Sequence, residues 1–510
     1  MSERHHIARD ISPVARATRT AILGLVFLVC IISLDTQGLW RDEVDQWRFA
    51  LQSWGEMLRN FTRAGWNGPL YSPLMRIWVA LTGDSVFAMR YFSLLWGVPS
   101  VALLYVLVKR LVDDAKFGEG AAQWSALLLA LSPYMVWYAQ EIKMYTWVPM
   151  LVLLALYALD RACAAPSWRC WAPYLWWGMV LTATTLAFYS HLLAALLIPV
   201  EVLWFWLHPR RQKRAWFGGV LTLALLTVPY LPMLRWVAPM LLAERETGYP
   251  TYSLWQMVRT LFSGWTLGVA QSLSSDPLPL YVALFFGAMA LVGTAALALR
   301  KRIATLAQLW LWMLVPLLLL WLVSLRGPIF TDRYLIWAAP AFYVLAGIGL
   351  ATIHDLWRWL IVILLLHVLI LNGVGLCRQA TLPIKPQFQL ATHHIEASRA
   401  PTELVLFQIP YNHHVALYYA EGSLDPWAEA PFTNWQKEDG SYYVDMSYVD
   451  EQMMVLTSGY SGVWLVYSEV ALWDDRELVK QWLDSHTRLV GHQAYVGVDV
   501  FHYVRDAPPR

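Results

Sequence analysis

Three carboxylates stand within four residues, at Asp42, Glu43 and Asp45, directly after the first long apolar run of the chain. Acids spaced in this way could supply a general base, which takes a proton from an attacking group in the transition state. They could equally begin a solvated helix, because carboxylates complement the positive end of the helix dipole. Spacing alone leaves both interpretations open.

A second set of polar and aromatic side chains lies at the ends of apolar runs rather than in their middles. Its members are Arg90, Glu141, Lys143, Tyr145, His191, Arg333 and Tyr334. Each one alone could be an interfacial anchor, since tyrosines, lysines and arginines are common where a helix leaves a membrane. Together they supply a carboxylate, cations and aromatic rings, which are the groups that an anionic, sugar-bearing lipid requires.

The composition places these residues in a membrane protein. Apolar residues make up 58% of the chain and charged residues 15%, against roughly 45 to 50% and about 25% in an average soluble chain. Most of the chain therefore cannot pack in water. The net charge is 38 minus 36, or +2, so no nucleic-acid partner is predicted. The four cysteines lack the spacing of a disulfide framework or a zinc site.

Runs of about 20 apolar residues are long enough to cross a bilayer, and they predict a polytopic α-helical membrane protein with about eleven transmembrane helices. We place these near residues 17–36, 86–108, 120–138, 142–159, 171–189, 191–207, 215–233, 278–299, 303–325, 334–352 and 358–376.

Lysines and arginines fall in alternate connections, including 210–214 and 300–302. Cytoplasmic loops accumulate such residues, so we predict an integral protein of the plasma membrane with a cytosolic amino terminus. The long connections 37–85 and 234–277 and the tail 377–510 are then exterior.

The first exterior connection contains an amphipathic stretch, 66–78, that is too short and too polar to span and is expected to lie along the membrane surface. The tail contains short β-rich runs at 404–409 and 463–467, each followed by a possible helix, at 412–420 and 474–486. This pattern predicts a small exterior α/β domain. The predicted domains are therefore 1–376, in the membrane, and 377–510, outside it.

The order of these pieces resembles the polyprenyl-phosphate-sugar-dependent glycosyltransferases of the GT-C fold, which include protein O-mannosyltransferases and aminoarabinose transferases. The resemblance covers roughly residues 17 to 350, and its motifs are at 40–43, 68–71, 83–90, 138–145, 189–191 and 332–334. It implies a GT-C bundle whose first exterior loop carries surface helices and the catalytic aspartate, here Asp42, with Glu43 beside it.

Two positions depart from that pattern. Many relatives have His-Pro-Pro or Lys-Pro where this chain has Asn67-Gly68-Pro69. Lys143 stands where arginine is common, and lysine lacks the planar fork that arginine offers to a phosphate. Phosphate contact is therefore predicted first for Arg333, then for Lys143 and Arg90.

A mechanism follows from the chemistry of a lipid-linked sugar phosphate. Its leaving group is already ionised, so the enzyme needs cations to hold that charge and a carboxylate, Asp42, to take the proton of an acceptor hydroxyl. A single displacement should invert the anomeric centre. Glu141, Tyr145, His191 and Tyr334 are candidates for binding the sugar or the acceptor, which could be a glycan, a lipid or a protein. No metal site or other cofactor is predicted, and a divalent cation is left open.

Two other classes of function remain. A polysaccharide polymerase or ligase that uses lipid-diphosphate donors would have a similar topology. A lipid transporter would also fit the apolar helices, although transporters commonly place carboxylates or broken helices at mid-depth in the membrane.

Overall fold

The computed structural model describes residues 13–61, 68–114, 116–165, 171–242, 250–271, 277–437 and 439–505. Asn67, at which the sequence departs from the family pattern, lies outside these ranges. The chain forms two compact units. The first contains the residues up to 34 together with 50–381, and the second contains residues 35–49 together with the chain from 382 onward.

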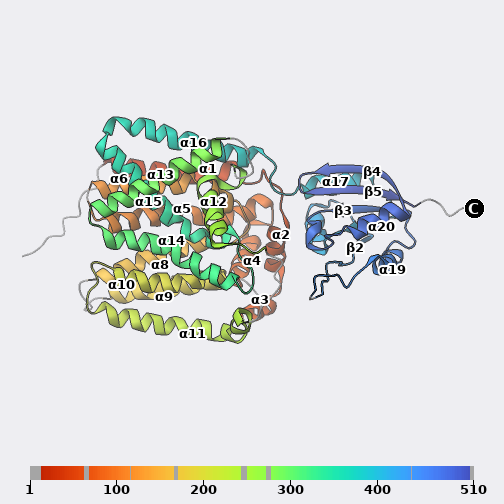
Figure 1. Cartoon of the computed structure of the whole chain (residues 1–510), viewed down its shortest axis with the longest axis horizontal. Coiled ribbons are helices and arrows are strands. Elements are labelled where there is room, and N and C mark those ends of the chain that lie inside the picture. Colours follow the sequence, from red (N-terminus) through yellow and green to blue (C-terminus); the bar gives the residue numbers. More distant parts are fainter. Residues whose placement is uncertain are drawn as a thin grey trace, which may run out of the picture. The chain divides into compact units, whose positions relative to one another are not determined.

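The first unit is a bundle of long helices that lie side by side (Figure 1). Its helices are α1 (Pro13–Ile32), α5 (Val86–Val112), α6 (Phe117–Leu131), α7 (Pro133–Ala139), α8 (Trp147–Ala164), α9 (Ala172–Ser190), α10 (Leu197–Leu207), α11 (Ala215–Leu242), α13 (Pro277–Leu299), α14 (Ile303–Ser324), α15 (Ala339–Leu356) and α16 (Ile361–Thr381). The structure therefore confirms the predicted polytopic helical architecture.

Each of the predicted apolar segments contains a helix, but seven helical segments of the described chain are long and apolar enough to span a membrane. They are 15–32, 86–112, 147–164, 277–299, 303–324, 332–356 and 358–381. The predicted span 120–138 is broken between α6 and α7, because Pro133 has no backbone N–H and Ser132 caps α7 by accepting a hydrogen bond from Met135 N at 3.2 Å. The count of about eleven crossings therefore stays a prediction.

Short helices follow α1, as the sequence predicted. They are α2 (Arg41–Leu51), whose residues 41–49 belong to the second unit, and α3 (Trp54–Asn60) and α4 (Tyr71–Thr82), which belong to the bundle. α3 begins with a capping box in which Ser53 and Glu56 each bond the other's backbone N–H. Ile77 and Leu81 leave α4 exposed on one side, as expected for a helix that lies at a membrane surface.

Helix α15 runs through the centre of the bundle, with residues 339–351 all buried. Its glycines allow neighbouring backbones to approach closely. A Cβ atom at Gly349 would lie 1.9 Å from the carbonyl oxygen of Met289 on α13, and one at Gly293 of α13 would lie 1.9 Å from that of Leu345. Small residues at helix crossings are typical of membrane bundles, where van der Waals packing holds the helices together.

The second unit contains a five-stranded sheet in the order β2-β1-β3-β5-β4, in which β2, β1 and β3 are parallel and β5 and β4 are antiparallel to their neighbours. The strands are β1 (Glu403–Phe407), β2 (Trp427–Glu429), β3 (Gly462–Tyr467), β4 (Arg488–Tyr495) and β5 (Val498–Val504). The helices are α17 (Phe388–Ser398), α18 (His413–Tyr419), α19 (Met446–Leu456) and α20 (Leu478–His486).

Successive residues of β3 face opposite sides of this sheet. Val463 and Leu465 join an apolar core with Trp482 of α20, whereas the Trp464 ring lies 5.7 Å from that of His394 on α17. The predicted small α/β domain is therefore confirmed, with helices on both faces of its sheet. The prediction ended the membrane domain at residue 376, but α16 continues to Thr381 before the second unit begins.

The close crossing of α13 and α15 generates a prediction about stability. Gly293→Ala should lower the melting temperature of the detergent-purified protein, because the new methyl group cannot fit beside the carbonyl oxygen of Leu345 unless the two helices separate. Gly178→Ala is the matched control, since a Cβ atom there meets nothing within 4 Å. An unchanged melting temperature in Gly293→Ala would contradict this account of the crossing.

Candidate functional site

Most of the predicted site residues lie around a break in the bundle, where residues 140–146 connect α7 to α8. Ser93 of α5 holds this connection: its Oγ donates to the carbonyl oxygen of Lys143 at 3.3 Å, and its own carbonyl oxygen accepts from Thr146 Oγ1 at 2.6 Å. Gln140 Nε2 donates to the carbonyl oxygen of Cys30 at 2.8 Å. The first of these bonds gives a partner to a backbone carbonyl oxygen of the break, and the other two hold its side chains against α5 and α1.

Aromatic rings from three distant parts of the chain meet beside this connection. The ring of Tyr145 lies 5.2 Å from that of Tyr138 and 6.4 Å from that of His191. His191 in turn lies 4.9 Å from the ring of Tyr334. The structure thus brings together Tyr145, His191 and Tyr334, which the sequence could only place at the ends of separate helices.

Charged groups lie among these rings. The guanidinium carbon of Arg333 is 6.0 Å from the centre of the Tyr145 ring, and both Arg333 and Lys143 are close enough to His191 to act on it electrostatically. Glu141 is 2% exposed, whereas Lys143 is half-buried. The imidazole of His191 is buried, and neither of its nitrogens has a hydrogen-bond partner among the described residues. It is therefore available to a bound molecule.

A cavity of about 480 Å³ adjoins this cluster. Tyr138 and Asp332 line one side of it, and the Tyr138 hydroxyl donates to Asp332 Oδ2 at 3.2 Å. Asp332 was part of a motif but was not predicted as a site residue. The volume is sufficient for a monosaccharide with its phosphate, because ligand pockets of about 300 to 1,000 Å³ are typical.

The other side of the cavity is formed by α12 (Leu254–Gln271), a helix that we did not predict within the connection 234–277. Its polar residues Gln256, Arg259, Thr260 and Ser263 all line the cavity. They follow the i, i+3, i+4, i+7 spacing of one helix face. That stripe within an otherwise apolar stretch was a readable signal for a helix with a functional face.

Two glycines allow α12 to approach the cluster. A Cβ atom at Gly264 would lie 3.1 Å from the ring of Tyr134, whose hydroxyl donates to the carbonyl oxygen of Asp332 at 3.0 Å. Gly268 kinks the helix at φ 70°. At this kink, Gln379 of α16 accepts from Val269 N at 3.3 Å and donates to the carbonyl oxygen of Pro133 at 2.8 Å, so that three helices are joined.

Arg259 is the cation that the sequence analysis missed. It is exposed, it lines the cavity, and it makes no hydrogen bond or ion pair with any residue that the structure describes. Arg90, by contrast, is 1% exposed and donates to the carbonyl oxygen of Leu34 at 3.0 Å, which gives it a place in the packing of α5 near α1. Arg259 lines the cavity, and Arg333 and Lys143 lie in the cluster beside it, so these three cations are the candidates for contact with a phosphate.

The predicted catalytic carboxylates belong to the second unit. Asp42 and Glu43 lie in the first turn of α2 and differ in environment. Asp42 is half-buried, whereas Glu43 is fully buried and its Oε2 accepts from Lys385 Nζ at 2.7 Å. The two neighbouring acids are thus suited to different tasks. No group of three or more metal-ligating side chains occurs in the described part of the chain.

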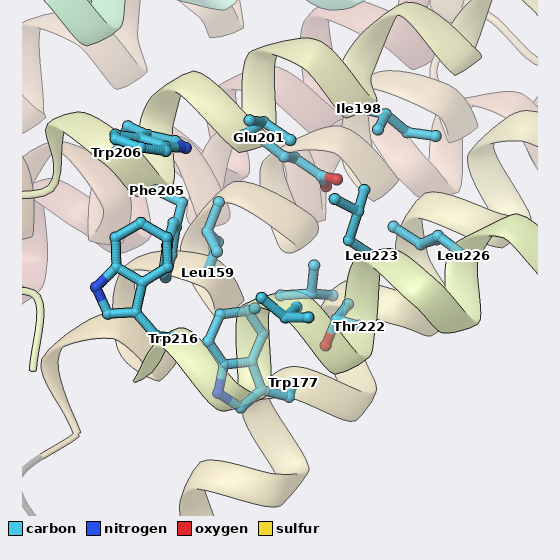
Figure 2. A pocket seen from close by; sticks show the side chains of 14 residues that line it. Leu159, Trp177, Ile198, Glu201, Phe205, Trp206, Trp216, Thr222, Leu223 and Leu226 are labelled. Atoms are coloured by element: carbon cyan, nitrogen blue, oxygen red, sulfur yellow. The ribbon is translucent and has the colours of Figure 1, made fainter. Parts of the chain in front are cut away.

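A second cavity, of about 100 Å³, lies between α8, α9, α10 and α11 and contains none of the predicted site residues. Figure 2 shows Trp177, Phe205 and Trp216 around it, with the carboxyl group of Glu201 facing inward. Glu201 accepts a hydrogen bond from Thr184 Oγ1 at 2.6 Å. This cavity is small and mainly apolar, so it is not a candidate for binding a sugar phosphate.

Three kinds of comparison relate this chain to known proteins. Residues 67–236 match the family model described as dolichyl-phosphate-mannose-protein mannosyltransferase, which is about a third of the chain. No curated protein matches the chain in sequence.

Solved structures match over nearly the whole chain. ArnT from Cupriavidus metallidurans in the apo state aligns with a TM-score of 0.62 and 15% identity over 96% of this chain and 98% of its own. The same enzyme bound to undecaprenyl phosphate aligns with a TM-score of 0.58 and 15% identity, over 96% and 99% of the two chains. The oligosaccharyltransferase of Archaeoglobus fulgidus aligns with a TM-score of 0.57 and 13% identity, over 95% and 73%.

These similarities define the class. The chain has the fold of the GT-C membrane glycosyltransferases, as its motif order predicted, and both the family model and these solved structures are those of sugar-transferring enzymes. At these identities, the similarity to solved structures establishes the fold alone.

Proposed function

We propose that this protein is an integral membrane glycosyltransferase that moves a sugar from a polyprenyl-phosphate donor to an acceptor hydroxyl at the exterior face of the plasma membrane. The observation that carries the proposal is the 480 Å³ cavity lined by Arg259 and Asp332, beside the cluster of Lys143, His191 and Arg333. A structure with the same fold has been solved bound to undecaprenyl phosphate.

The cations would hold the phosphate of the donor. A phosphate leaving group is already ionised, so catalysis requires positive charge at the position where negative charge develops on the departing oxygen. Arg333 and Arg259 can each offer the planar fork that suits phosphate oxygens, and Lys143 adds a point charge. Release of the polyprenyl phosphate then needs no proton from the protein.

The aromatic rings and acids would hold the sugar. Tyr145, His191 and Tyr334 offer ring faces and polar tips, and Glu141 and Asp332 offer acceptors for sugar hydroxyls. The unpartnered nitrogens of His191 would gain hydrogen bonds on binding, which removes the cost of leaving them buried and unsatisfied. Such polar groups fix the orientation of the sugar, which determines the face that the acceptor attacks.

Asp42 would act as the general base. Its half-exposed position in the first turn of α2 supports this role, since a base must be reachable by the acceptor hydroxyl. One carboxylate acting once on the acceptor implies a single displacement with inversion of the anomeric centre. A polymerase or ligase that uses lipid-diphosphate donors would share most of this arrangement, but its donor head group would be larger.

The proposal is tested by incubating the purified protein with a panel of radiolabelled polyprenyl-phosphate sugars and measuring release of the polyprenyl phosphate. Turnover of at least one monophosphate donor is the expected result. If only lipid-diphosphate oligosaccharides are consumed, the protein is a polymerase or ligase. If transbilayer movement of a lipid occurs without any sugar transfer, the transporter interpretation is correct.

The phosphate-binding role of the arginines predicts a loss of donor affinity. Arg333→Ala and Arg259→Ala should each weaken donor binding about 10- to 100-fold, because a charge-assisted hydrogen bond contributes roughly 1.5 to 3 kcal/mol. Lysine at either position should restore the affinity only in part. Arg358→Ala removes an exposed arginine that does not line the cavity and is the matched control. Unchanged donor affinity in both cavity variants would contradict the assignment.

The role of Asp42 predicts a loss of turnover without a loss of binding. Asp42→Asn keeps the size of the side chain but cannot accept a proton, so kcat should fall by about 10² to 10⁴ while donor affinity is retained. Asp45→Asn is the control on the same helix; Asp45 pairs with Arg48 at 3.7 Å. If Asp45→Asn is inactive and Asp42→Asn is active, the base has been assigned to the wrong carboxylate.

The exterior location of the reaction predicts a pattern of protease sensitivity. Protease added to intact cells or right-side-out vesicles should digest the domain that follows Thr381, whereas the basic connection 208–214 should be protected. The reverse pattern would invert the topology and place the cavity end of the bundle in the cytosol.

A further inference from the structure

The part of α2 that carries Asp42, residues 41–49, belongs with the C-terminal domain rather than with the bundle. Residues 35–49 form one compact unit with the chain from 382 onward. The bonds within this unit show how the helix is held. Gln37 donates from Nε2 to the carbonyl oxygen of Leu382 at 2.7 Å, and its Oε1 accepts from Ile384 N at 3.1 Å. The nitrogen and the oxygen of the Gln37 side-chain amide therefore both hold the segment that precedes α2.

Further contacts follow along the helix. Leu39 N donates to the hydroxyl of Tyr419 on α18 at 2.5 Å, and the ring of Trp47 lies 5.1 Å from that of Tyr418. Arg41 Nη1 lies 3.5 Å from Oε2 of Glu469, the second residue after β3. The carboxyl ends of parallel strands are where α/β sheets ordinarily bind ligands. Here that edge, after β3, contacts the amino-terminal end of α2.

The ion pair between Glu43 and Lys385 is the most deeply buried of these contacts. The distance from Lys385 Nζ to Glu43 Oε2 is 2.7 Å, Glu43 is 0% exposed and Lys385 is 6% exposed. A buried charge that loses its partner is strongly unfavourable. Because consecutive residues on a helix point about 100° apart, fixing Glu43 toward Lys385 also fixes the direction in which the Asp42 side chain points.

Lys385 is itself attached to the sheet. The next two residues contact the turn between β4 and β5: Gln387 N donates to the carbonyl oxygen of Val496 at 2.9 Å, and Val496 N donates to Gln387 Oε1 at 3.1 Å. A Cβ atom at Gly497 would lie 3.0 Å from Pro386. The β4–β5 turn therefore holds residues 386 and 387, the neighbouring Lys385 holds Glu43, and Glu43 is adjacent to Asp42 on α2.

The residues around Arg48 of α2 are compatible with its positive charge. Arg48 of α2 lies near the histidine pair at the start of α18. Burial, followed by the neighbouring His413 and Arg48, lowers the pKa of His414 to about 4. Burial also lowers the pKa of His413. Both imidazoles are thus neutral at pH 7, so they do not repel the cation on α2.

From these contacts we infer that Lys385 is a positioning residue for the general base: it acts through Glu43 to orient α2, so that the C-terminal domain sets the direction of Asp42. This inference rests on the proposed role of Asp42. It assigns Glu43 to orientation rather than to direct chemistry. It also gives the C-terminal domain a function in the reaction.

The test compares Lys385→Met with Lys480→Met in the full-length protein. Lys480 also forms a 2.9 Å ion pair, with Asp484 on α20, but on the surface. Lys385→Met should lower kcat about 10- to 100-fold at unchanged donor KM, because a misplacement of about 1 Å can cost that much in rate. Lys480→Met should keep the wild-type kcat. Lys385→Arg, which retains the charge, should recover most of the loss.

A second variant separates orientation from folding. Glu43→Gln combined with Lys385→Met leaves no uncompensated buried charge, so this protein should keep the wild-type melting temperature. Its kcat should nevertheless stay reduced, since the ion pair that orients α2 is gone. A wild-type kcat in this double variant, or in Lys385→Met, overturns the inference even where Asp42→Asn is inactive. An active Asp42→Asn variant instead overturns the proposed function, whatever the behaviour of Lys385.

Discussion

A polypeptide cannot leave its helical path inside a bilayer without providing new partners for the peptide groups that it exposes, since hydrocarbon offers none. In this protein the break between α7 and α8 is bonded to α5 and α1, and Gln379 of α16 bonds the carbonyl oxygen of Pro133 at the start of α7. Ser93 Oγ donates to the carbonyl oxygen of Lys143 within the break. The side chains of Gln140 and Thr146, which belong to the break, donate to the carbonyl oxygens of Cys30 and Ser93. The irregular backbone is thereby fixed in place, and the polar cavity can exist beside it.

The same constraint explains why the candidate site is assembled from distant segments. A charged or hydrogen-bonding side chain is tolerated in such a bundle where it faces protein or a polar cavity. Residues 138–145, His191, Asp332 and the polar face of α12 all meet at one place, so that each reduces the cost of burying the others. Packing of small residues, as at the crossing of Gly293 and Gly349, holds the surrounding helices close enough for this to occur.

Periodicity and composition were sufficient to predict the apolar helices and the small α/β domain, because burial in lipid or in a sheet imposes a simple repeat on the sequence. The order of the motifs was sufficient to name Tyr145, His191 and Arg333 as candidate residues of one site. Helix α12 was missed because Gln256, Arg259 and their neighbours make it too polar for a hydropathy search. The ion pair of Glu43 with Lys385 joins residues 342 positions apart. A contact between such distant residues cannot be predicted from a local sequence pattern.

That separation has a consequence for biogenesis. The ribosome makes Glu43 long before Lys385, and at about 5 to 20 residues per second the interval is roughly 20 to 70 s. During this interval the bundle can insert into the membrane while α2 still lacks the domain that holds it. If Lys385 orients Asp42, the base is not oriented until the domain that contains Lys385 has been synthesised and folded. A chain truncated before residue 382 would then carry every cation of the cavity and still lack an oriented base.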